Sequence, residues 1–230
     1  MIFIIYITGD THQLTDTVKL VTHRFTEQSA MTKEDYLIIL GDTGFTCKTQ
    51  DLNYCLKYFN EKNFTTLFID GNHEDFNRLN KLPIEEWNGG KVHKVTDSII
   101  HLMRGQVFEI EGLKIFTMGG AYSIDKHLRK PGINWWKEEL PNKTEMDEGL
   151  INLRKYNNKV DYILTHDAPN KYLYFGYKYK IHTDDTEFKR YLEHIDNTVE
   201  FKHWYFSHHH IDRVIDDKHT VVFNNIIKLK

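Results

Sequence analysis

Short apolar runs recur along the chain, and stretches with a helical spacing of apolar positions lie between them. The runs are rich in β-branched and aromatic residues, which is typical of strands. They predict strands at residues 2–7, 36–40, 65–69, 162–164 and 204–206. The helical spacing predicts amphipathic helices at residues 15–26, 51–62 and 145–156. Strands that alternate with helices predict an α/β domain built in layers around central sheets.

Two further pairs of short strands are predicted to form hairpins. Residues 107–110 and 113–117 flank Glu111-Gly112, and a polar residue followed by glycine is common in two-residue hairpin turns. Residues 213–215 and 220–223 form the second pair. Hairpins added to alternating strands and helices indicate the same layered α/β domain.

The organisation of the chain predicts one domain over residues 1–230. No internal repeat and no linker rich in Pro, Gly or Ser interrupts it. Thr144, with Asp147 three residues later, is predicted to cap the third helix. A domain of this length buries about 70% of the surface that its unfolded chain exposes.

Composition narrows the function classes. A net charge of −3 and a pI near 6.5 give no overall attraction to nucleic acid or to an anionic membrane. The opening apolar run lacks preceding basic residues and is too short for a signal peptide or a membrane span. Cys47 and Cys55 form no C-x-x-C pair, so we expect a cytoplasmic protein.

Each of the five main strands is followed by residues that can bind a metal ion. Gly-Asp-Thr-His (residues 9–12) follows the first, Gly-Asp-Thr-Gly (41–44) the second and Gly-Asn-His-Glu (71–74) the third. His166 follows the fourth strand and His208-His209-His210 the fifth. Ligands of open α/β sheets bind outside the carboxyl ends of the strands. We therefore expect these side chains to meet at one edge of the fold.

The candidate metal ligands combine carboxylate, imidazole and amide groups: Asp10, His12, Asp42, Asn72, His166, His208 and His210. Seven donors are too many for one tetrahedral site. Two ions about 4 Å apart, with Asp42 bridging them, accommodate all seven and leave room for a water and a substrate oxygen. A donor set without thiolate suits manganese, iron, zinc or nickel rather than calcium, and manganese is our first expectation.

Spacing refines this assignment. In Asp10-x-His12 and His208-x-His210, an extended backbone points both side chains to the same side. His209 then faces away, and a slip of register by one residue would make it the ligand instead. The glycines before Asp10, Asp42 and Asn72 are expected to allow tight turns and a close approach of the backbone to an ion.

Taken together, the five pieces resemble the calcineurin-like metallophosphoesterases. That family carries D-x-H, G-D-x-x, G-N-H-[DE], a lone H and G-H-x-H in this order, and the match spans residues 9–210. The resemblance implies a four-layer sandwich of two mixed β-sheets flanked by helices. It implies that one metal is held by Asp10, His12, Asp42 and His210, and the other by Asp42, Asn72, His166 and His208. It also makes His73 the catalytic imidazole beside the leaving oxygen.

The chain departs from the family pattern at two positions. Gly44 stands where many relatives carry a second Asp, and the arginine of the protein Ser/Thr phosphatases does not follow it. Ser207 replaces the usual Gly before the last histidine pair, a small change that should fit. The segment 119–129, followed by Trp135-Trp136, looks like a subgroup of bacterial and phage phosphoesterases.

The expected function is dinuclear-metal-dependent hydrolysis of phosphodiesters or small nucleotide-like phosphates. A water shared by the two ions would attack phosphorus while His73, oriented by Asp42, assists the leaving group. Arg104 and Arg129 are expected to bind the rest of the substrate. A dianionic monoester usually needs an arginine fork, which residues 42–45 lack, so diesters are favoured.

Three alternatives stay open. A nuclease acting on DNA or RNA predicts a basic surface beside the site, which the net charge does not indicate. A phosphomonoesterase would share the metal site. A non-catalytic scaffold of the same fold should have lost His73 or several ligands, and all are present. No membrane contact is expected, and the oligomeric state is left open.

Residues outside the motifs carry weaker expectations. Residues 122–141 are predicted to form a wall or lid beside the metals, because long irregular insertions are often functional. Trp135 and Trp136 are expected in the core. Phe45 and Tyr122 are candidates to stack on a base. The remaining histidines are expected at the surface or at caps: His23, His93, His101, His127, His182, His194, His203 and His219.

Overall fold

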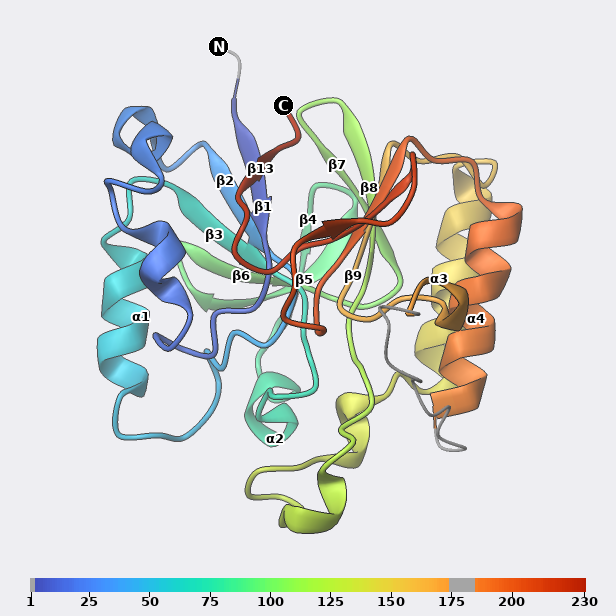
Figure 1. The fold of residues 1–230 in the computed structure, drawn as a ribbon, viewed down its shortest axis with the longest axis horizontal. Coiled ribbons are helices and arrows are strands. Elements are labelled where there is room, and N and C mark those ends of the chain that lie inside the picture. The colour runs from blue at the N-terminus through green and yellow to red at the C-terminus, as the bar shows by residue number, and fades with distance from the viewer. Residues whose placement is uncertain (1–2, 174–184) are drawn as a thin grey trace.

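The computed structural model describes residues 3–173 and 185–230. Two sheets pack face to face between layers of helices, which confirms the predicted four-layer α/β sandwich (Figure 1). The first sheet contains β1 (Ile5–Thr8), β2 (Tyr36–Ile39), β3 (Thr65–Phe68), β4 (Ile84–Trp87), β5 (Gly90–Thr96), β6 (Ile99–Leu102) and β13 (Ile227–Lys228). The second contains β7 (Gln106–Ile110), β8 (Leu113–Met118), β9 (Tyr162–Thr165), β10 (His203–Phe206), β11 (Arg213–Val214) and β12 (His219–Val221).

Both sheets are mixed, with parallel centres and antiparallel edges. Their strand orders are β13-β1-β2-β3-β6-β5-β4 and β11-β12-β10-β9-β8-β7. Strands β1, β2, β3 and β6 run parallel, as do β8, β9, β10 and β12. The five strands predicted to end in metal ligands, β1, β2, β3, β9 and β10, therefore lie in the parallel parts of the two sheets.

The alternation of side chains explains why the sheets pack. Ile5 and Ile7 of β1 point between the sheets, where they join Phe108 and Leu164 of the other sheet. Tyr6, between them in sequence, points to the outer face and packs with Phe59 of α1 (Leu52–Asn60). A period of two thus gives each strand one face for the central core and one for the helices.

Helices α3 (Lys143–Lys155) and α4 (Thr186–Thr198) cover the outer face of the second sheet (Figure 1). Leu153 of α3 and Leu192 of α4 pack in one buried cluster with Trp204 of β10. Helix α4 was not predicted, although Phe188, Leu192 and Ile195 follow helical spacing. A short helix, α2 (Phe76–Leu79), follows the Gly-Asn-His-Glu segment.

The predicted helix at residues 15–26 is wrong. This stretch forms two 3-10 turns, Thr17–Leu20 and Thr26–Ala30. Its many β-branched residues favour an α-helix only weakly. In addition, the buried Lys19 side chain bonds to the carbonyl oxygens of Gly9, Asp10 and Phe223, which ties the turn to the strand ends.

The other local predictions have mixed outcomes. Both hairpins are present, and Glu111 and Gly112 have the positive φ angles, 53° and 77°, that a tight turn of this kind requires. The N-cap of α3 is Asn142 rather than Thr144, because Asn142 and Glu145 form a reciprocal capping box. No helix in the described part of the chain is long and apolar enough to cross a membrane.

Three of the histidines expected at the surface are buried: His93, His101 and His219. Each is hydrogen-bonded to another polar side chain, which offsets the cost of burial. His182 lies outside the described residues. Phe45 is a core residue of the layer that contains α1 and so is not available to stack on a ligand.

Candidate metal centre

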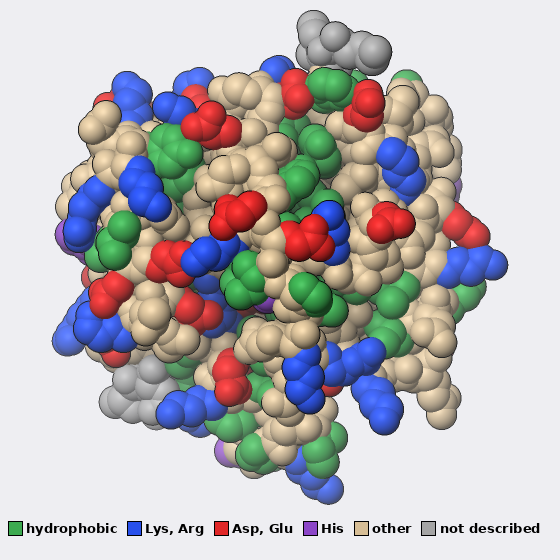
Figure 2. Space-filling view, turned by 180° about the vertical axis from the view of Figure 1, so that it is seen from behind, with side chains coloured by type: hydrophobic (Ala, Val, Ile, Leu, Met, Phe, Trp, Pro, Cys, Tyr) green, Lys and Arg blue, Asp and Glu red, His purple; other side chains and the backbone are tan. Residues whose placement is uncertain are grey.

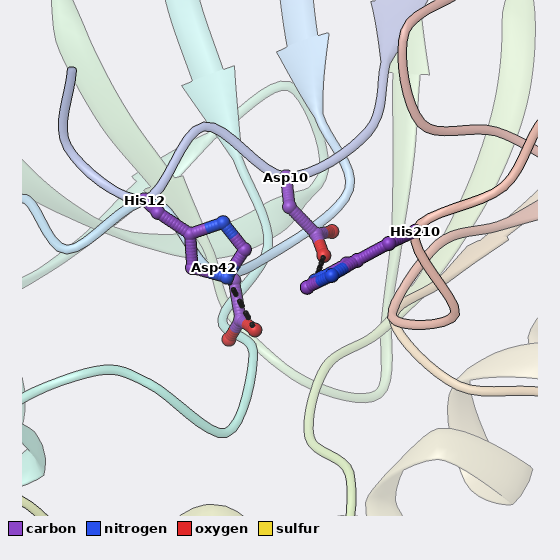
Figure 3. Close-up of side chains that lie close together, drawn as sticks. All are labelled: Asp10, His12, Asp42 and His210. Atoms are coloured by element: carbon purple, nitrogen blue, oxygen red, sulfur yellow. Dashed lines mark ion pairs between the residues drawn. The ribbon is translucent and has the colours of Figure 1, made fainter. Parts of the chain in front are cut away.

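Six of the seven predicted ligands form two adjoining groups of donor atoms. Asp10, His12, Asp42 and His210 place their donors within 4.8 Å of one another, and Asp42, His166 and His208 do the same. Figure 3 shows Asp10 facing His210 and His12 facing Asp42 across the first group. Asp42 belongs to both groups, as expected of a bridging carboxylate.

The seventh ligand, Asn72, completes the second group. Its Oδ1 lies 3.2 Å from Nε2 of His166, and that nitrogen lies 3.5 Å from Oδ1 of Asp42. His209 belongs to neither group, because its Nε2 lies 3.3 Å from Oδ1 of Asp167. The structure therefore places His208 and His210, not His209, among the donors.

The prediction that an extended backbone orients these side chains is wrong. The residues are not extended, because His12, Asp42, His208 and His210 have φ angles of 41°, 49°, 65° and 52°. Residues other than glycine rarely adopt positive φ, and such strained positions concentrate at functional sites. Four of the seven ligands thus stand on tight left-handed turns directly after strands.

Two of the three glycines before the ligands, Gly41 and Gly71, allow close packing of the ligands themselves. A Cβ on Gly71 would lie 2.0 Å from Oδ1 of Asp42, and one on Gly41 would lie 2.2 Å from Nδ1 of His166. A close approach to an ion was predicted, and the close approach seen at these two glycines is to neighbouring ligand side chains. Any side chain at Gly41 or Gly71 would push a donor out of its group.

Polar contacts behind the ligands fix which atom faces the centre. Nδ1 of His166 lies 2.7 Å from the carbonyl oxygen of Leu40, so this nitrogen carries the proton and Nε2 is the donor atom. Nδ1 of His12 lies 2.7 Å from Oδ2 of Asp16 in the same way. Sequence reasoning missed Asp16, although its position four residues after a candidate ligand was a usable signal.

Asn72 is oriented by a buried chain of hydrogen bonds that sequence reasoning also missed. Nδ2 of Asn72 donates to Oγ of Ser123 at 3.0 Å, and Oγ donates to Oε2 of Glu139 at 2.5 Å. The amide of Ser123 donates to the other oxygen of Glu139. All three side chains are buried. The chain turns Oδ1 of Asn72 toward the second donor group and links it to residues 122–141.

Ser207, the departure from the family pattern, contacts a ligand. Its Oγ lies 2.5 Å from Oδ1 of Asp10 and 2.7 Å from the carbonyl oxygen of Val222. The prediction that serine fits here is consistent with this geometry, and the hydroxyl also holds Asp10 in place.

Electrostatics favour positive charge at the centre. Although burial opposes the shift, the charges and hydrogen bonds of nearby imidazoles hold the pKa of Asp42 well below its usual range, and that of Asp10 is lowered too. Burial likewise opposes the shifts of the two imidazoles, yet Asp42 and Asp10 raise the pKa of His12 to about 9 and that of His166 to about 10. His208 is the exception, because burial lowers its pKa to about 3.

The donor set fits divalent metal ions. Oδ2 of Asp10 is buried and accepts no hydrogen bond of good geometry, although Nε2 of His210 lies 3.0 Å away. An orphaned buried carboxylate oxygen beside an imidazole nitrogen is satisfied when both bind one cation. Mixed imidazole, carboxylate and amide donors suit first-row transition metals.

His73 and Arg129 border the donor groups at a cavity of about 290 Å³. Nη1 of Arg129 lies 3.0 Å from Nδ1 of His73, and Asp125 holds the guanidinium at 2.7 Å. Nε2 of His73 lies 4.0 Å from Oδ2 of Asp42. Burial lowers the pKa of His73, Asp42 opposes this shift, and Arg129 adds to it. Residues 122–141 form one wall of this cavity through Arg129 and Trp136, as predicted.

The other predicted substrate-binding residue, Arg104, is placed elsewhere. Its guanidinium is buried, donates to Asp70 at 2.6 and 2.8 Å, and lies 3.2 Å from Glu145. It does not line the cavity beside His73. Arg104 lines a second, larger cavity instead.

Comparisons with known proteins agree with this geometry. No family model matches the chain. Over 236 residues it is 25% identical to a lariat debranching enzyme of Drosophila pseudoobscura pseudoobscura, which covers 88% of this chain and 41% of the relative. A lariat debranching enzyme of Saccharomyces cerevisiae is 29% identical over 169 residues, or 64% of this chain and 40% of the relative. The chain thus spans less than half the length of these relatives.

The solved structures supply a likeness of fold. A candidate 5'-nucleotidase from Staphylococcus aureus, in complex with alpha-ketoglutarate, superposes with a TM-score of 0.54 at 15% identity. The match covers 98% of this chain and 50% of that one. The ordered motifs, the two donor groups that share Asp42, the relatives and the fold agree. In its motifs, its donor groups and its fold, the chain resembles the calcineurin-like metallophosphoesterase superfamily.

The two donor groups share Asp42 and therefore adjoin each other, and the imidazole of His73 lies beside them. Residues 122–141 border two cavities, with Trp136 lining the smaller one and Trp135 the larger one.

Proposed function

We propose that the protein is a metal-dependent phosphodiesterase that acts on diesters of nucleotide-like chemistry. The observation that carries this proposal is the pair of donor groups sharing Asp42, which fits two ions on one bridging carboxylate. The lariat debranching relatives hydrolyse phosphodiester bonds, which supports the same substrate class. We further propose manganese as the working metal, residues 1–230 as one catalytic domain, and a cytoplasmic location, which two unpaired cysteines favour.

The residues around the centre account for the chemistry in outline. Two divalent ions, when bound, lower the pKa of a coordinated water and offset charge that develops on the phosphoryl oxygens. Asp10, His12, Asp42 and His210 would hold one ion, and Asp42, Asn72, His166 and His208 the other. His73 lies beside Asp42 without belonging to either group, so its imidazole is placed to donate a proton to the leaving oxygen.

Arg129 is the cation best placed to receive the substrate. It contacts His73 and lines the cavity of about 290 Å³ beside the donors. One partly paired arginine suits the single charge of a diester better than the two charges of a monoester. The absence of an arginine in residues 42–45 supports the same preference.

A nuclease is the second candidate, and the relatives' activity favours it. Nucleic-acid binding usually requires basic side chains gathered on one surface. On the face shown in Figure 2, basic and acidic side chains are interspersed. We therefore propose a small or locally recognised diester ahead of a long nucleic acid that is held by its backbone charge.

The test is a comparison of nitrophenyl esters with the manganese-reconstituted protein. We expect a higher kcat/KM for bis(4-nitrophenyl) phosphate than for 4-nitrophenyl phosphate. The Asp42→Asn variant should abolish turnover, whereas the matched Asp217→Asn variant, at an exposed position, should retain it. A clear preference for the monoester, or equal turnover by Asp42→Asn and the unmodified protein, would overturn the proposal.

A further inference from the structure

A second cavity, of about 710 Å³, lies on the other side of residues 122–141. Cavities of this volume hold ligands of nucleoside size. Phe76, Tyr122 and Trp135 supply aromatic walls from two segments of the chain. Residues 122–141 thus border two cavities, and of these two only the smaller one is lined by candidate metal donors, His12 and Asp42.

Two of the aromatic rings face a common point. The ammonium group of Lys126 lies 4.9 Å from the ring centroid of Tyr122 and 5.9 Å from that of Trp135, over both ring faces. A planar group that displaces the flexible lysine side chain from this point would contact both rings. Aromatic faces arranged in this way are the usual surface on which bases stack.

Charge argues against an ionic ligand in the larger cavity. Arg104 is already paired with Asp70 and Glu145. Lys126 and Arg104 already lie over aromatic rings, where a cationic ligand would have to bind. Acidic and basic side chains line the same cavity in near balance, Glu138 and Glu139 together with Lys137, so its lining does not select an anion. Among the possible ligands, an uncharged ring binds at this wall with the smallest electrostatic cost.

A buried chain of hydrogen bonds fixes which nitrogen atoms of His93 and His101, two residues that line this cavity, donate and which accept. Arg104 keeps the Asp70 carboxylate paired, and Nε2 of His101 donates to that carboxylate at 3.1 Å. Nδ1 of His101 is then an acceptor, and Nδ1 of His93 donates to it at 3.1 Å. Burial and the adjacent His101 lower the pKa of His93 to about 4, so the ring is neutral. Its Nε2 is therefore an acceptor on a ring that lines the cavity.

We propose that this cavity binds an uncharged planar heterocycle of the nucleobase class, as the base of the diester substrate. The proposal rests on the proposed function in assigning the base to a substrate. Glu139 of the cavity wall is connected to the candidate ligand Asn72 through Ser123 by bonds of 2.5 and 3.0 Å. One buried chain of side chains thus lies between this cavity and the second donor group.

The experiment titrates adenosine, cytidine, guanosine and uridine into the metal-free full chain, with inorganic phosphate as a separate probe. Calorimetry gives the affinity, and the indole N–H resonance of Trp135 reports contact without any substitution. We expect at least one nucleoside to bind saturably and to shift the Trp135 signal. Inorganic phosphate should leave that signal unchanged.

Two variants sharpen the result. Trp135→Leu removes a stacking ring and should weaken the nucleoside by about 5- to 150-fold. Leu128→Ala, on the same segment but 76% exposed, is the matched control and should bind as the unmodified chain does. Circular dichroism establishes that both variants are folded.

No binding of any nucleoside at 10 mM (roughly the weakest interaction worth assigning) would overturn the proposal. Binding that leaves the Trp135 resonance in place would also overturn it. Neither the probes nor the assay involves metal or turnover. A failure of the nucleosides to bind therefore does not contradict the phosphodiesterase proposal. Conversely, if diester hydrolysis fails, this titration still decides whether the cavity binds a nucleoside.

Discussion

The Ser123→Ala substitution should weaken the binding of the second metal ion and leave the binding of the first unchanged. Oγ of Ser123 accepts from Nδ2 of the ligand Asn72 at 3.0 Å and donates to Glu139 at 2.5 Å. Without the hydroxyl, Nδ2 of Asn72 loses its acceptor. The hydrogen bond that turns Oδ1 of Asn72 toward His166 is then lost. The four donors of the first group, Asp10 among them, do not touch Ser123 in any described contact.

The magnitude follows from the groups left without partners. A buried NH₂ without an acceptor costs about 1–3 kcal/mol. Loss of an outer partner of a ligand typically lowers metal affinity by about 10- to 100-fold, or ~1.4–2.7 kcal/mol. Both routes give the same range, so we expect the second ion to bind Ser123→Ala about 10- to 100-fold more weakly.

Calorimetric titration of manganese into the metal-free chain resolves the two binding events. Ser98→Ala is the matched control, because Oγ of Ser98 also contacts an asparagine side chain, Oδ1 of Asn60 at 2.8 Å, away from the donors. Electron paramagnetic resonance adds a signature that a general loss of stability would not produce. With two equivalents of manganese, the unmodified chain should show a coupled pair, and Ser123→Ala should show isolated ions.

Equal second-site affinities in Ser123→Ala and Ser98→Ala would refute the reasoning. Parallel weakening of both ions in Ser123→Ala would do so as well, because it would show a general disturbance of the centre. Ser123→Thr keeps the hydroxyl and should restore the second ion.

Three further predictions concern the centre itself. His73→Ala should keep both metals but lose turnover on poor leaving groups more than on nitrophenolate esters; equal losses in the two substrate types would contradict the acid role. Asp42→Asn should weaken both ions in the same titration, since its carboxylate belongs to both groups, and loss of only one would contradict bridging. The raised pKa values of His12 and His166, about 9 and about 10, mean that both are protonated in the metal-free chain at pH 7. Metal binding should therefore release about two protons at pH 7, measured by calorimetry in buffers of different ionisation enthalpy, and affinity should rise with pH; His208, with its pKa lowered to about 3, should release none.

The same two histidines set the pH dependence of the metal-free fold. Their pKa values are raised above the ordinary 6.5, so they stabilise the fold below that pH, and this stabilisation is lost as the pH rises through about 9 to 10. The free energy of unfolding of the metal-free chain should consequently fall over that window.

The candidate metal ligands could be brought together from the sequence because strand ends are strongly marked in it. A β-branched run, a glycine and a polar donor indicate a ligand without any knowledge of distant contacts. The backbone at His12 and His208 could not be predicted this way. Positive φ is uncommon for any residue other than glycine, and the surrounding structure must hold a histidine in it.

The parts that were missed depend on long-range contacts. Ser123 contacts Asn72 across 51 positions of sequence, and Glu139 contacts Ser123 across 16, and nothing in their local sequence shows these relations. His93 and His101 look like surface residues until strands β5 and β6 pair and bring their rings together. Helix α4 is different, because its apolar spacing was present in the sequence and should have been recognised.

The most direct test of the central claim is diester hydrolysis measured as a function of bound manganese. The metal-free chain is titrated with manganese while turnover of bis(4-nitrophenyl) phosphate and metal content are followed together. A dinuclear centre predicts little activity with the first equivalent and a steep rise with the second. Full activity at one bound ion per chain, or no diester hydrolysis with two ions bound, would contradict it.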